Sequence, residues 1–128
     1  MSNRKNISSG AVWEDLIGYS RAVRINNIVE ISGTTSTDGD RIIGVGNVYE
    51  QAKYILKKIE KILLTANASL EDVIRIRMFV TDISKWEEIG KAHNEFFQNI
   101  KPAATMVEVK SLIHPDLLIE IEATAIIH

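Results

Sequence analysis

The chain has 128 residues, a formal net charge of −2, 45% hydrophobic residues and no cysteine, a composition typical of one soluble globular domain. The charge gives no reason to expect a nucleic-acid partner held through phosphate contacts, and the lack of cysteine excludes disulfides and cysteine metal sites. No apolar stretch approaches the roughly 20 residues that span a bilayer, and residues 1–10 lack the hydrophobic run of a secretory signal. We therefore expect one cytoplasmic domain over residues 1–128.

Regular elements are predicted along most of the chain after an irregular, polar lead-in over residues 1–15. In order they are strands 19–25 and 28–34, a surface loop 33–46, a helix 48–66, a strand 73–80, a helix from Ser84 to Phe97, and strands 105–109 and 117–127. The Asn26-Asn27 pair tolerates positive φ and favours a hairpin between the first two strands.

Both helices have apolar side chains at steps of three and four residues. Ser84 and Glu87 have the spacing of a capping box at the start of the second helix. The first helix also carries a lysine stripe that is typical of a solvated face, formed by Lys53, Lys57, Lys58 and Lys61.

The last strand alternates cleanly, with Ile119 and Ile121 on one face and Glu120 and Glu122 on the other. Four strands have a purely apolar face for the helices to cover, at Val29/Ile31, Ile76/Met78/Val80, Val107/Val109 and Ile119/Ile121/Ala123. These patterns predict an α+β fold in the order β-β-α-β-α-β-β, a single mixed sheet with both helices on one face.

The second face of this sheet is predicted to mix apolar side chains with charges of both signs. Its members are Glu30, Ser32, Arg75, Arg77, Phe79, Met106, Glu108, Glu120 and Glu122. Such a face is too apolar for free solvent and too charged for the core of a monomer. We therefore expect burial against other copies of the chain in a closed homo-oligomer.

Six stretches along nearly the whole chain resemble the RidA/YjgF/YER057c/UK114 (Rid) family. They are GYSRAV, VEISGTT, SLEDVIRIRMFVTDI, HNEFF, KPAATMVEV and LIEIEATA. The resemblance implies a chorismate-mutase-like, YjgF-like fold in which three copies form a trimeric barrel with their sheets inside. It also implies a ligand cleft between each pair of neighbours.

In the imine deaminases of that family, the cleft holds a Tyr, a Ser, an Arg that clamps the substrate carboxylate and a Glu that positions water. Tyr19, Ser32 and Glu120 match three of these residues, whereas the Arg position is Ala104. Met106 stands where some members have Cys. Alanine cannot make a bidentate, charge-assisted contact, so its loss costs on the order of 3–5 kcal/mol of binding where the clamp is needed.

The chain is thus more similar to an Arg-less branch of the family, marked by GYSRAVR, for which the resemblance implies no common reaction. Glu120 either acts as an acid or water-orienting group, or pairs with Arg75 or Arg77. Tyr19 and Ser32 either contact a ligand or satisfy polar groups of the hairpin.

Two further residues, His93 and Arg21, each have a functional and a structural interpretation. His93 lies on the apolar stripe of the second helix and either projects into the cleft as an acid, base or donor, or bonds a backbone carbonyl at the helix boundary. Arg21 is placed by alternation on the side of Tyr19, where it either replaces the missing clamp or is an exposed surface arginine.

The function expected from these features is a homotrimer that hydrolyses an enamine, an imine or a related reactive carbonyl compound. Glu120 would set the water, and the substrate would be surrounded by Tyr19, Ser32, Arg21, His93, Ala104 and the backbone of Thr105 and Met106. A non-enzymatic binding or sensing trimer is the alternative, and a ribonuclease or translation inhibitor is disfavoured by the pI of 5.9. We expect no cofactor, no membrane contact and no metal, because His114 and His128 lack ligand partners at useful spacing.

Overall fold

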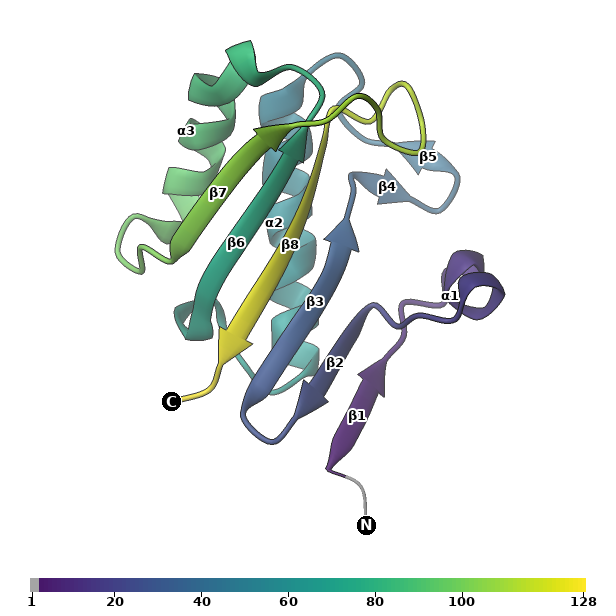
Figure 1. Cartoon of the computed structure of the whole chain (residues 1–128), viewed down its shortest axis with the longest axis vertical. Coiled ribbons are helices and arrows are strands. Elements are labelled where there is room, and N and C mark those ends of the chain that lie inside the picture. The colour runs from purple at the N-terminus through teal and green to yellow at the C-terminus, as the bar shows by residue number, and fades with distance from the viewer. Residues whose placement is uncertain (1–2) are drawn as a thin grey trace.

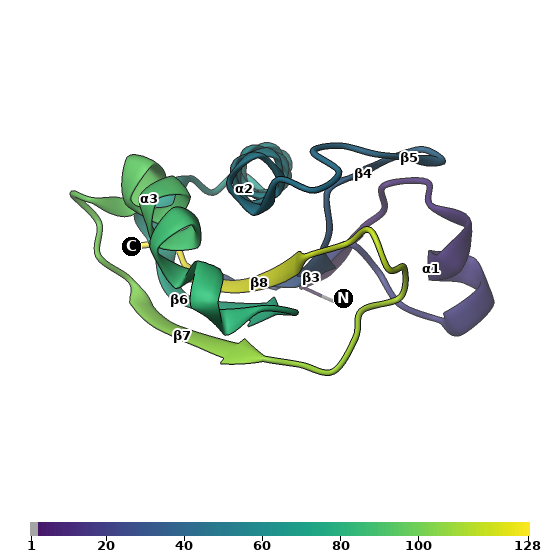
Figure 2. The same ribbon diagram turned by 90° about the horizontal axis from the view of Figure 1, so that it is seen from above.

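A computed structural model of the chain describes residues 3–128 and contains one six-stranded mixed sheet with two long helices on one face (Figures 1 and 2). The elements, in chain order, are β1 (Arg4–Ile7), α1 (Val12–Ile17), β2 (Ala22–Ile25), β3 (Ile28–Thr34), β4 (Thr37–Asp38), β5 (Arg41–Ile42), α2 (Val48–Thr65), η1 (Leu70–Asp72), β6 (Val73–Val80), η2 (Ile83–Lys85), α3 (Trp86–Phe97), β7 (Ala103–Glu108) and β8 (Ile119–Ile126). No helix within residues 3–128 is long and apolar enough to cross a membrane.

The predicted α+β architecture is confirmed. The strand order is β1-β2-β3-β8-β6-β7, in which β6 and β7 run parallel and all other neighbours antiparallel. The hairpin between β2 and β3 turns at Asn26, whose φ is +52°. β8 lies at the centre, and its predicted alternation holds, since Ile119 and Ile121 are fully buried on the side of α2 and α3.

Two elements lie in the lead-in, which was wrongly predicted to be irregular; residues 1 and 2 are outside the described part. β1 pairs antiparallel with β2, and α1 follows it. Glu14 is buried and accepts hydrogen bonds from Ser8 and Ser9, which fixes the turn between β1 and α1. Burial alone would raise the pKa of Glu14, but the bonds from both serines outweigh it and lower this pKa.

The segment predicted as a surface loop contains a two-stranded ribbon, β4 and β5. Buried Gln51 on α2 supports the end of this segment and the connection before β8. Its Nε2 donates to the carbonyl oxygens of Gly44 (3.2 Å) and Asp116 (2.8 Å), and its Oε1 accepts from the amide of Leu118 (2.8 Å). One polar side chain therefore joins α2 to the turn just before it and to the connection before β8, which is 65 to 67 residues further along the chain.

The predicted orientation of β7 is wrong by one residue. Met106 lies alongside Met78 and packs on the helix side, and Glu108 accepts a hydrogen bond from the amide of Ile83 (3.0 Å). Val107, expected in the core, is 42% exposed. β7 is an edge strand with weak alternation, so its phase is set by parallel pairing with β6 rather than by its own pattern.

Candidate functional site

The carboxylate of Glu120 lies on the open face of the sheet, directly over the backbone of Gly33 in the neighbouring strand β3. A Cβ added to Gly33 would be 2.1 Å from Glu120 Oε2, so only glycine leaves room for this arrangement. Glu120, Glu122, Phe79 and Gly33 line one side of a pocket of about 330 Å³. The apolar ring and the two acidic groups form a half-buried acidic hollow.

The predicted structural alternative for Glu120, an ion pair with Arg75 or Arg77, is not found among residues 3–128. Arg75 instead donates to Thr105 Oγ1 (2.6 Å), and Arg77 is in register with Glu122. Burial raises the pKa of Glu120; the nearby Arg21 guanidinium opposes this increase, and Glu122 adds to it. A carboxyl group without an ion-pair partner and with a raised pKa is a candidate for proton transfer.

This raised pKa predicts a pH-dependent effect of Glu120→Gln on stability. The folded protein holds the Glu120 proton more tightly than the unfolded chain, so the ionised carboxylate destabilises the fold above the folded-state pKa. Glu120→Gln is therefore expected to have a higher free energy of unfolding than wild type at pH 7. The gain should shrink as pH falls through the folded-state pKa and vanish below the unfolded value of about 4.3. Urea unfolding of both proteins over a pH series measures this difference in unfolding free energy. A difference that does not change with pH would contradict a raised pKa for this carboxyl.

Tyr19 and Ser32 line an adjacent pocket of about 490 Å³ between α1 and strands β1 to β3. Ser32 Oγ donates to the carbonyl oxygen of Ser20 (2.7 Å), as expected if this hydroxyl closes the hairpin, and within residues 3–128 it accepts no hydrogen bond. Tyr19 is 36% exposed, and its hydroxyl has no hydrogen-bond partner within residues 3–128. Since Ser32 and Gly33 are consecutive, this pocket and the Glu120 hollow are neighbours on the open face.

Arg21 lies between these hollows and the helix side of the sheet. Its Nη2 donates to the carbonyl oxygen of Gly33 (2.6 Å), and its guanidinium carbon is 5.8 Å from the centre of the Tyr19 ring. Its Nε is buried without a hydrogen-bond partner in the described part of the chain. Arg21 is thus a partly buried cation near Glu120, fixed by its hydrogen bond to Gly33, rather than a free surface arginine.

The other predicted residues are not brought together with Glu120. Ala104 and Met106 lie on the helix side of β7, because they are in register with Ile76 and Met78. Thr105 points to the open face, but two strand spacings, roughly 10 Å, separate β7 from β8, the strand that carries Glu120. The predicted site residues therefore form two groups that cannot meet in one copy of the chain.

His93 belongs to the second group, on α3. It is half-buried, stacks on Phe97 with ring centres 4.7 Å apart, and burial lowers its pKa. Its Nε2 is buried and has no hydrogen-bond partner among residues 3–128, so the backbone carbonyl expected as its structural partner is not found at this atom. His93 lines none of the pockets described above.

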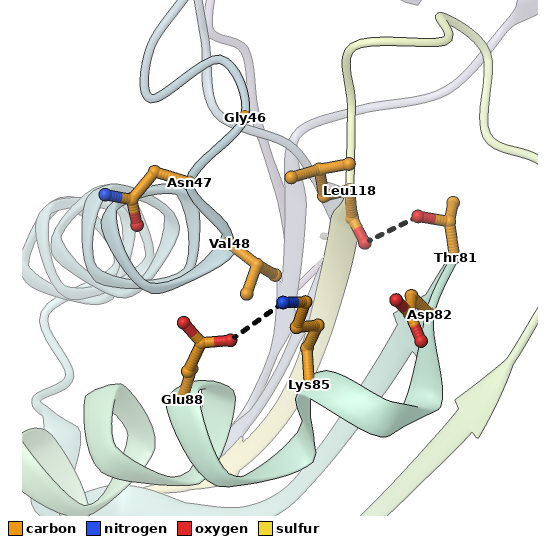
Figure 3. Close-up of a pocket in the computed structure, with 8 residues that line it drawn as sticks. All are labelled: Gly46, Asn47, Val48, Thr81, Asp82, Lys85, Glu88 and Leu118. Carbon is orange, nitrogen blue, oxygen red and sulfur yellow. Dashed lines mark hydrogen bonds and ion pairs between the residues drawn. The ribbon is translucent and has the colours of Figure 1, made fainter.

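A separate pocket of about 380 Å³ lies on the helix side, where α2 and α3 begin (Figure 3). Val48 and Leu118 form its apolar part, and Lys85 reaches toward Glu88 with an N–O distance of 3.8 Å. None of the predicted site residues lies in it. Among residues 3–128, no buried side-chain polar atom without a hydrogen-bond partner lies in this pocket.

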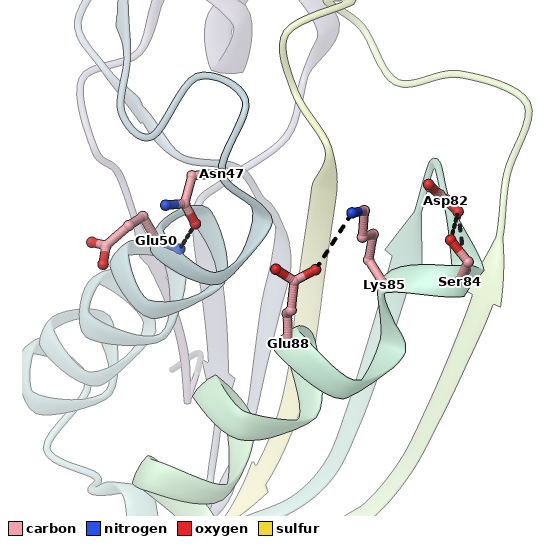
Figure 4. Close-up of polar contacts among 6 residues, drawn as sticks. All are labelled: Asn47, Glu50, Asp82, Ser84, Lys85 and Glu88. Carbon is pink, nitrogen blue, oxygen red and sulfur yellow. Dashed lines mark hydrogen bonds and ion pairs between the residues drawn. The ribbon is translucent and has the colours of Figure 1, made fainter.

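The polar groups near this pocket serve the ends of the helices (Figure 4). Asn47 caps α2 by accepting from the amide of Glu50 (3.0 Å), and Asp82 accepts from the amide and hydroxyl of Ser84. Hydrogen bonds from Ser84 lower the pKa of Asp82. The predicted capping box of Ser84 and Glu87 is wrong, because α3 begins after Lys85 without a side-chain cap. A short 3-10 turn, η2, occupies the place of the expected first turn.

Within residues 3–128, no three His, Asp or Glu side chains gather where they could hold a metal ion. The chemistry available on the open face therefore comes from a raised-pKa carboxyl, a tyrosine hydroxyl, a serine hydroxyl and a guanidinium. These groups can donate or accept protons and can orient water beside a small polar molecule.

The sequence matches the family model described as endoribonuclease L-PSP over residues 13–127. The chain is 31% identical to an uncharacterized protein of Streptomyces coelicolor, covering 94% of this chain and 90% of that one. It is 34% identical to the 3-aminoacrylate deaminase RutC of Acinetobacter baylyi, covering 86% and 87%.

Solved structures agree with this match. The crystal structure of Rv2704 from Mycobacterium tuberculosis, described as a member of the YjgF/YER057c/UK114 family, has 45% sequence identity and a TM-score of 0.88, covering 97% of this chain and 99% of that one. Yeast Mmf1 has 25% identity and a TM-score of 0.85 over 98% of this chain and 99% of that one. The chain therefore belongs to the YjgF/YER057c/UK114 (Rid) family.

Proposed function

We propose that the chain is a cytoplasmic homotrimer that binds a small enamine, imine or related carbonyl compound between neighbouring copies and hydrolyses it with Glu120. The observation that carries the proposal is the half-buried Glu120 carboxyl, which has a raised pKa and no ion-pair partner in the described part of the chain. It lies over Gly33, and Tyr19, Ser32 and Arg21 are nearby. The 3-aminoacrylate deaminase among its relatives supports this class, because aminoacrylate is an enamine by its name.

The separation of the candidate residues supports a site shared between copies. Tyr19, Ser32 and Glu120 line the open face, whereas Ala104 and Met106 lie on the other side of edge strand β7. A neighbouring copy that covered the open face with its own β7 edge would bring the two groups together. Sedimentation velocity at micromolar concentration should give a trimer, and a monomer alone would remove the proposed site.

The proposed reaction uses Glu120 in both protonation states. As a carboxylic acid it gives a proton to the enamine carbon, which converts the enamine into an iminium ion and leaves Glu120 as a carboxylate. As a carboxylate it accepts a proton from the water that adds to the C=N carbon. Glu120 passes that proton to the nitrogen and then takes the hydroxyl proton of the carbinolamine as the C–N bond breaks. Ammonia leaves, a carbonyl compound remains, and Glu120 is again a carboxylic acid. Burial raises the pKa of Glu120, which brings its protonated form closer to neutral pH than that of an ordinary glutamate.

Ala104 indicates that the substrate carries no carboxylate at this position. Wild type is accordingly expected to release little ammonia from freshly generated 2-aminoacrylate, whereas Ala104→Arg gains activity. The added guanidinium would supply a charge-assisted contact worth roughly 3 kcal/mol, or about a hundredfold in kcat/KM. The position is exposed at the edge of β7, so the longer side chain meets no core packing. Ammonia release by both proteins at equal concentration measures the effect.

Each outcome of that assay changes the proposal differently. Activity in wild type would mean that the clamp is dispensable or replaced, with Arg21 as the first residue to mutate. Activity in Ala104→Arg alone would mean that the other site residues can still carry out hydrolysis and that the wild-type protein acts on a different class of substrate. Silence in both would favour a trimer that binds a metabolite without converting it. In a binder, Glu120→Gln would lower ligand affinity only slightly, whereas in an enzyme it would abolish turnover.

A ribonuclease function follows the description of the family model. The net charge of −2 and the pI of 5.9 do not favour it. An RNA titration that shows no binding at any salt concentration would remove this alternative, and binding that weakens steeply with salt would restore it.

A further inference from the structure

A fourth pocket, of about 800 Å³, is larger than the three described above, lies on the helix side of the sheet and contains none of the groups assigned to hydrolysis except Arg21. It is bordered by the segment before α1, by the β4–β5 ribbon and by α2, which lie around the same end of the sheet (Figures 1 and 2). Its charged groups include three cations, Arg21, Lys58 and Lys61. Trp13, Tyr54 and Ile62 add apolar surface.

Lys58 is not the solvated side chain that the lysine stripe predicts. It is half-buried, and its Nζ donates to the carbonyl oxygens of Thr35 (3.0 Å) and Thr37 (2.9 Å). Arg21 is held in the same way by the carbonyl oxygen of Gly33 (2.6 Å). Carbonyl groups at alternate positions of one segment therefore fix two cations at the wall of the pocket.

These two cations lie close enough to repel each other. Burial lowers the pKa of Lys58, Arg21 lowers it further, and Asp38 acts in the opposite direction. Asp38 is largely engaged elsewhere, because it pairs with Arg41 at 3.1 Å on the ribbon. Asp40 is the other carboxylate at the rim. Arg21 and Lys58 are two like charges held at a partly buried wall of the pocket. A bound anion would offset the repulsion between them.

We propose that this pocket binds a small organic oxyanion with an apolar body, such as an aromatic carboxylate or phosphate monoester. The oxyanion would lie near Lys58 and Arg21, Lys61 would reach it from the next turn of α2, and the apolar body would contact Trp13. This site is separate from the Glu120 hollow, which Arg21 does not line, although the charge of Arg21 lowers the pKa of Glu120. An anion bound here would weaken the influence of Arg21 on Glu120.

Trp13 allows a direct binding test. It lines the pocket and is 51% exposed, whereas the second tryptophan, Trp86, lies at the start of α3. In a Trp86→Phe protein, Trp13 fluorescence is titrated with benzoate, with phenyl phosphate and with benzyl alcohol as the neutral probe. Saturable quenching by either anion, but not by the alcohol, is expected. Equal quenching by the alcohol, or no saturation by any probe at millimolar concentration, would overturn the proposal.

Charge variants on α2 provide the matched control. Lys61→Gln should weaken anion binding about threefold to fivefold, whereas Lys57→Gln, the same change outside the pocket, should leave it unchanged. Equal weakening by both variants would indicate a diffuse charge effect and overturn the site. Glu120→Gln should still bind the anion, so failure of the hydrolytic proposal and failure of this one are distinguishable.

Discussion

A Gln51→Leu variant is expected to lose roughly 3 kcal/mol of its free energy of unfolding. Leucine has a similar volume, so the substitution opens no large cavity, and the effect comes from three lost hydrogen bonds. The Leu118 amide loses its acceptor, and the Asp116 carbonyl loses its donor. The Gly44 carbonyl keeps a bond from the Asn47 amide. Leaving a buried donor or acceptor unpaired costs about 1–3 kcal/mol each.

Urea unfolding at one fixed protein concentration measures this loss, because the apparent stability of an oligomer depends on concentration. Gln98→Leu is the matched control, since Gln98 is exposed at the end of α3 and should change the unfolding free energy by less than about 0.5 kcal/mol. A Gln51→Leu effect no larger than that of the control would show that the three bonds contribute nothing net. The connection before β8 carries the chain to Glu120, so this variant should also loosen the candidate site.

The sequence predicts those elements whose side chains alternate between core and surface. β8 shows two distinct faces, and α2 has a continuous apolar stripe, so both were predicted correctly. β1 has one buried residue, Ile7, and α1 exposes most of its apolar side chains, so neither has a periodic signal. Their formation depends on pairing with β2 and on Glu14 rather than on local pattern.

Gln51 had a signal that was overlooked. It lies between Val48 and Ile55 at steps of three and four residues, which places it on the buried stripe of α2. A polar residue on such a stripe predicts a partner from another segment. The identity of that partner is not local information, because the Asp116 carbonyl and the Leu118 amide are more than sixty residues away.

The candidate site was predictable only in part. The resemblance selected Glu120, Tyr19 and Ser32, and the structure places all three on neighbouring hollows of the open face. It did not predict that the Glu120 carboxylate lies over Gly33, or that Arg21 donates a hydrogen bond to the Gly33 carbonyl oxygen. The position of Glu120 over Gly33 depends on the pairing of β3 with β8 across about ninety residues of chain, and the Arg21 bond depends on a side chain that reaches a carbonyl group 12 residues further on. The distance between Ala104 and Glu120 is likewise a consequence of strand order, which periodicity does not determine.

A Gly33→Ala variant is expected to displace the Glu120 carboxylate while the fold persists. The new Cβ would lie 2.1 Å from Oε2 but 3.0 Å from Cδ and 3.3 Å from Cγ, so rotation of the end of a flexible side chain relieves the clash. The displaced carboxylate gains solvent, and its pKa should fall toward the ordinary value of about 4.3. Carbon-13 NMR titration of labelled glutamate side chains measures this shift directly, whatever the substrate is.

Gly90→Ala is the matched control for this substitution. A Cβ at Gly90 meets no atom within 4 Å, so alanine there should leave the Glu120 titration unchanged and stabilise α3 by up to about 1 kcal/mol. An unchanged Glu120 pKa in Gly33→Ala would mean that the missing side chain at Gly33 does not determine the position of the carboxylate.

Where Glu120 performs the proposed acid–base steps, Gly33→Ala should lower turnover by at least about a hundredfold. The Gly33→Ala change is made in whichever of the two proteins, wild type or Ala104→Arg, is active in the ammonia-release assay. Because both changes act through one carboxylate, the Gly33→Ala/Glu120→Gln double variant should be no slower than Glu120→Gln alone. Additive losses would show that Gly33 affects a different step. Full activity of Gly33→Ala, with the carboxylate shown by NMR to be displaced, would instead remove Glu120 from the mechanism.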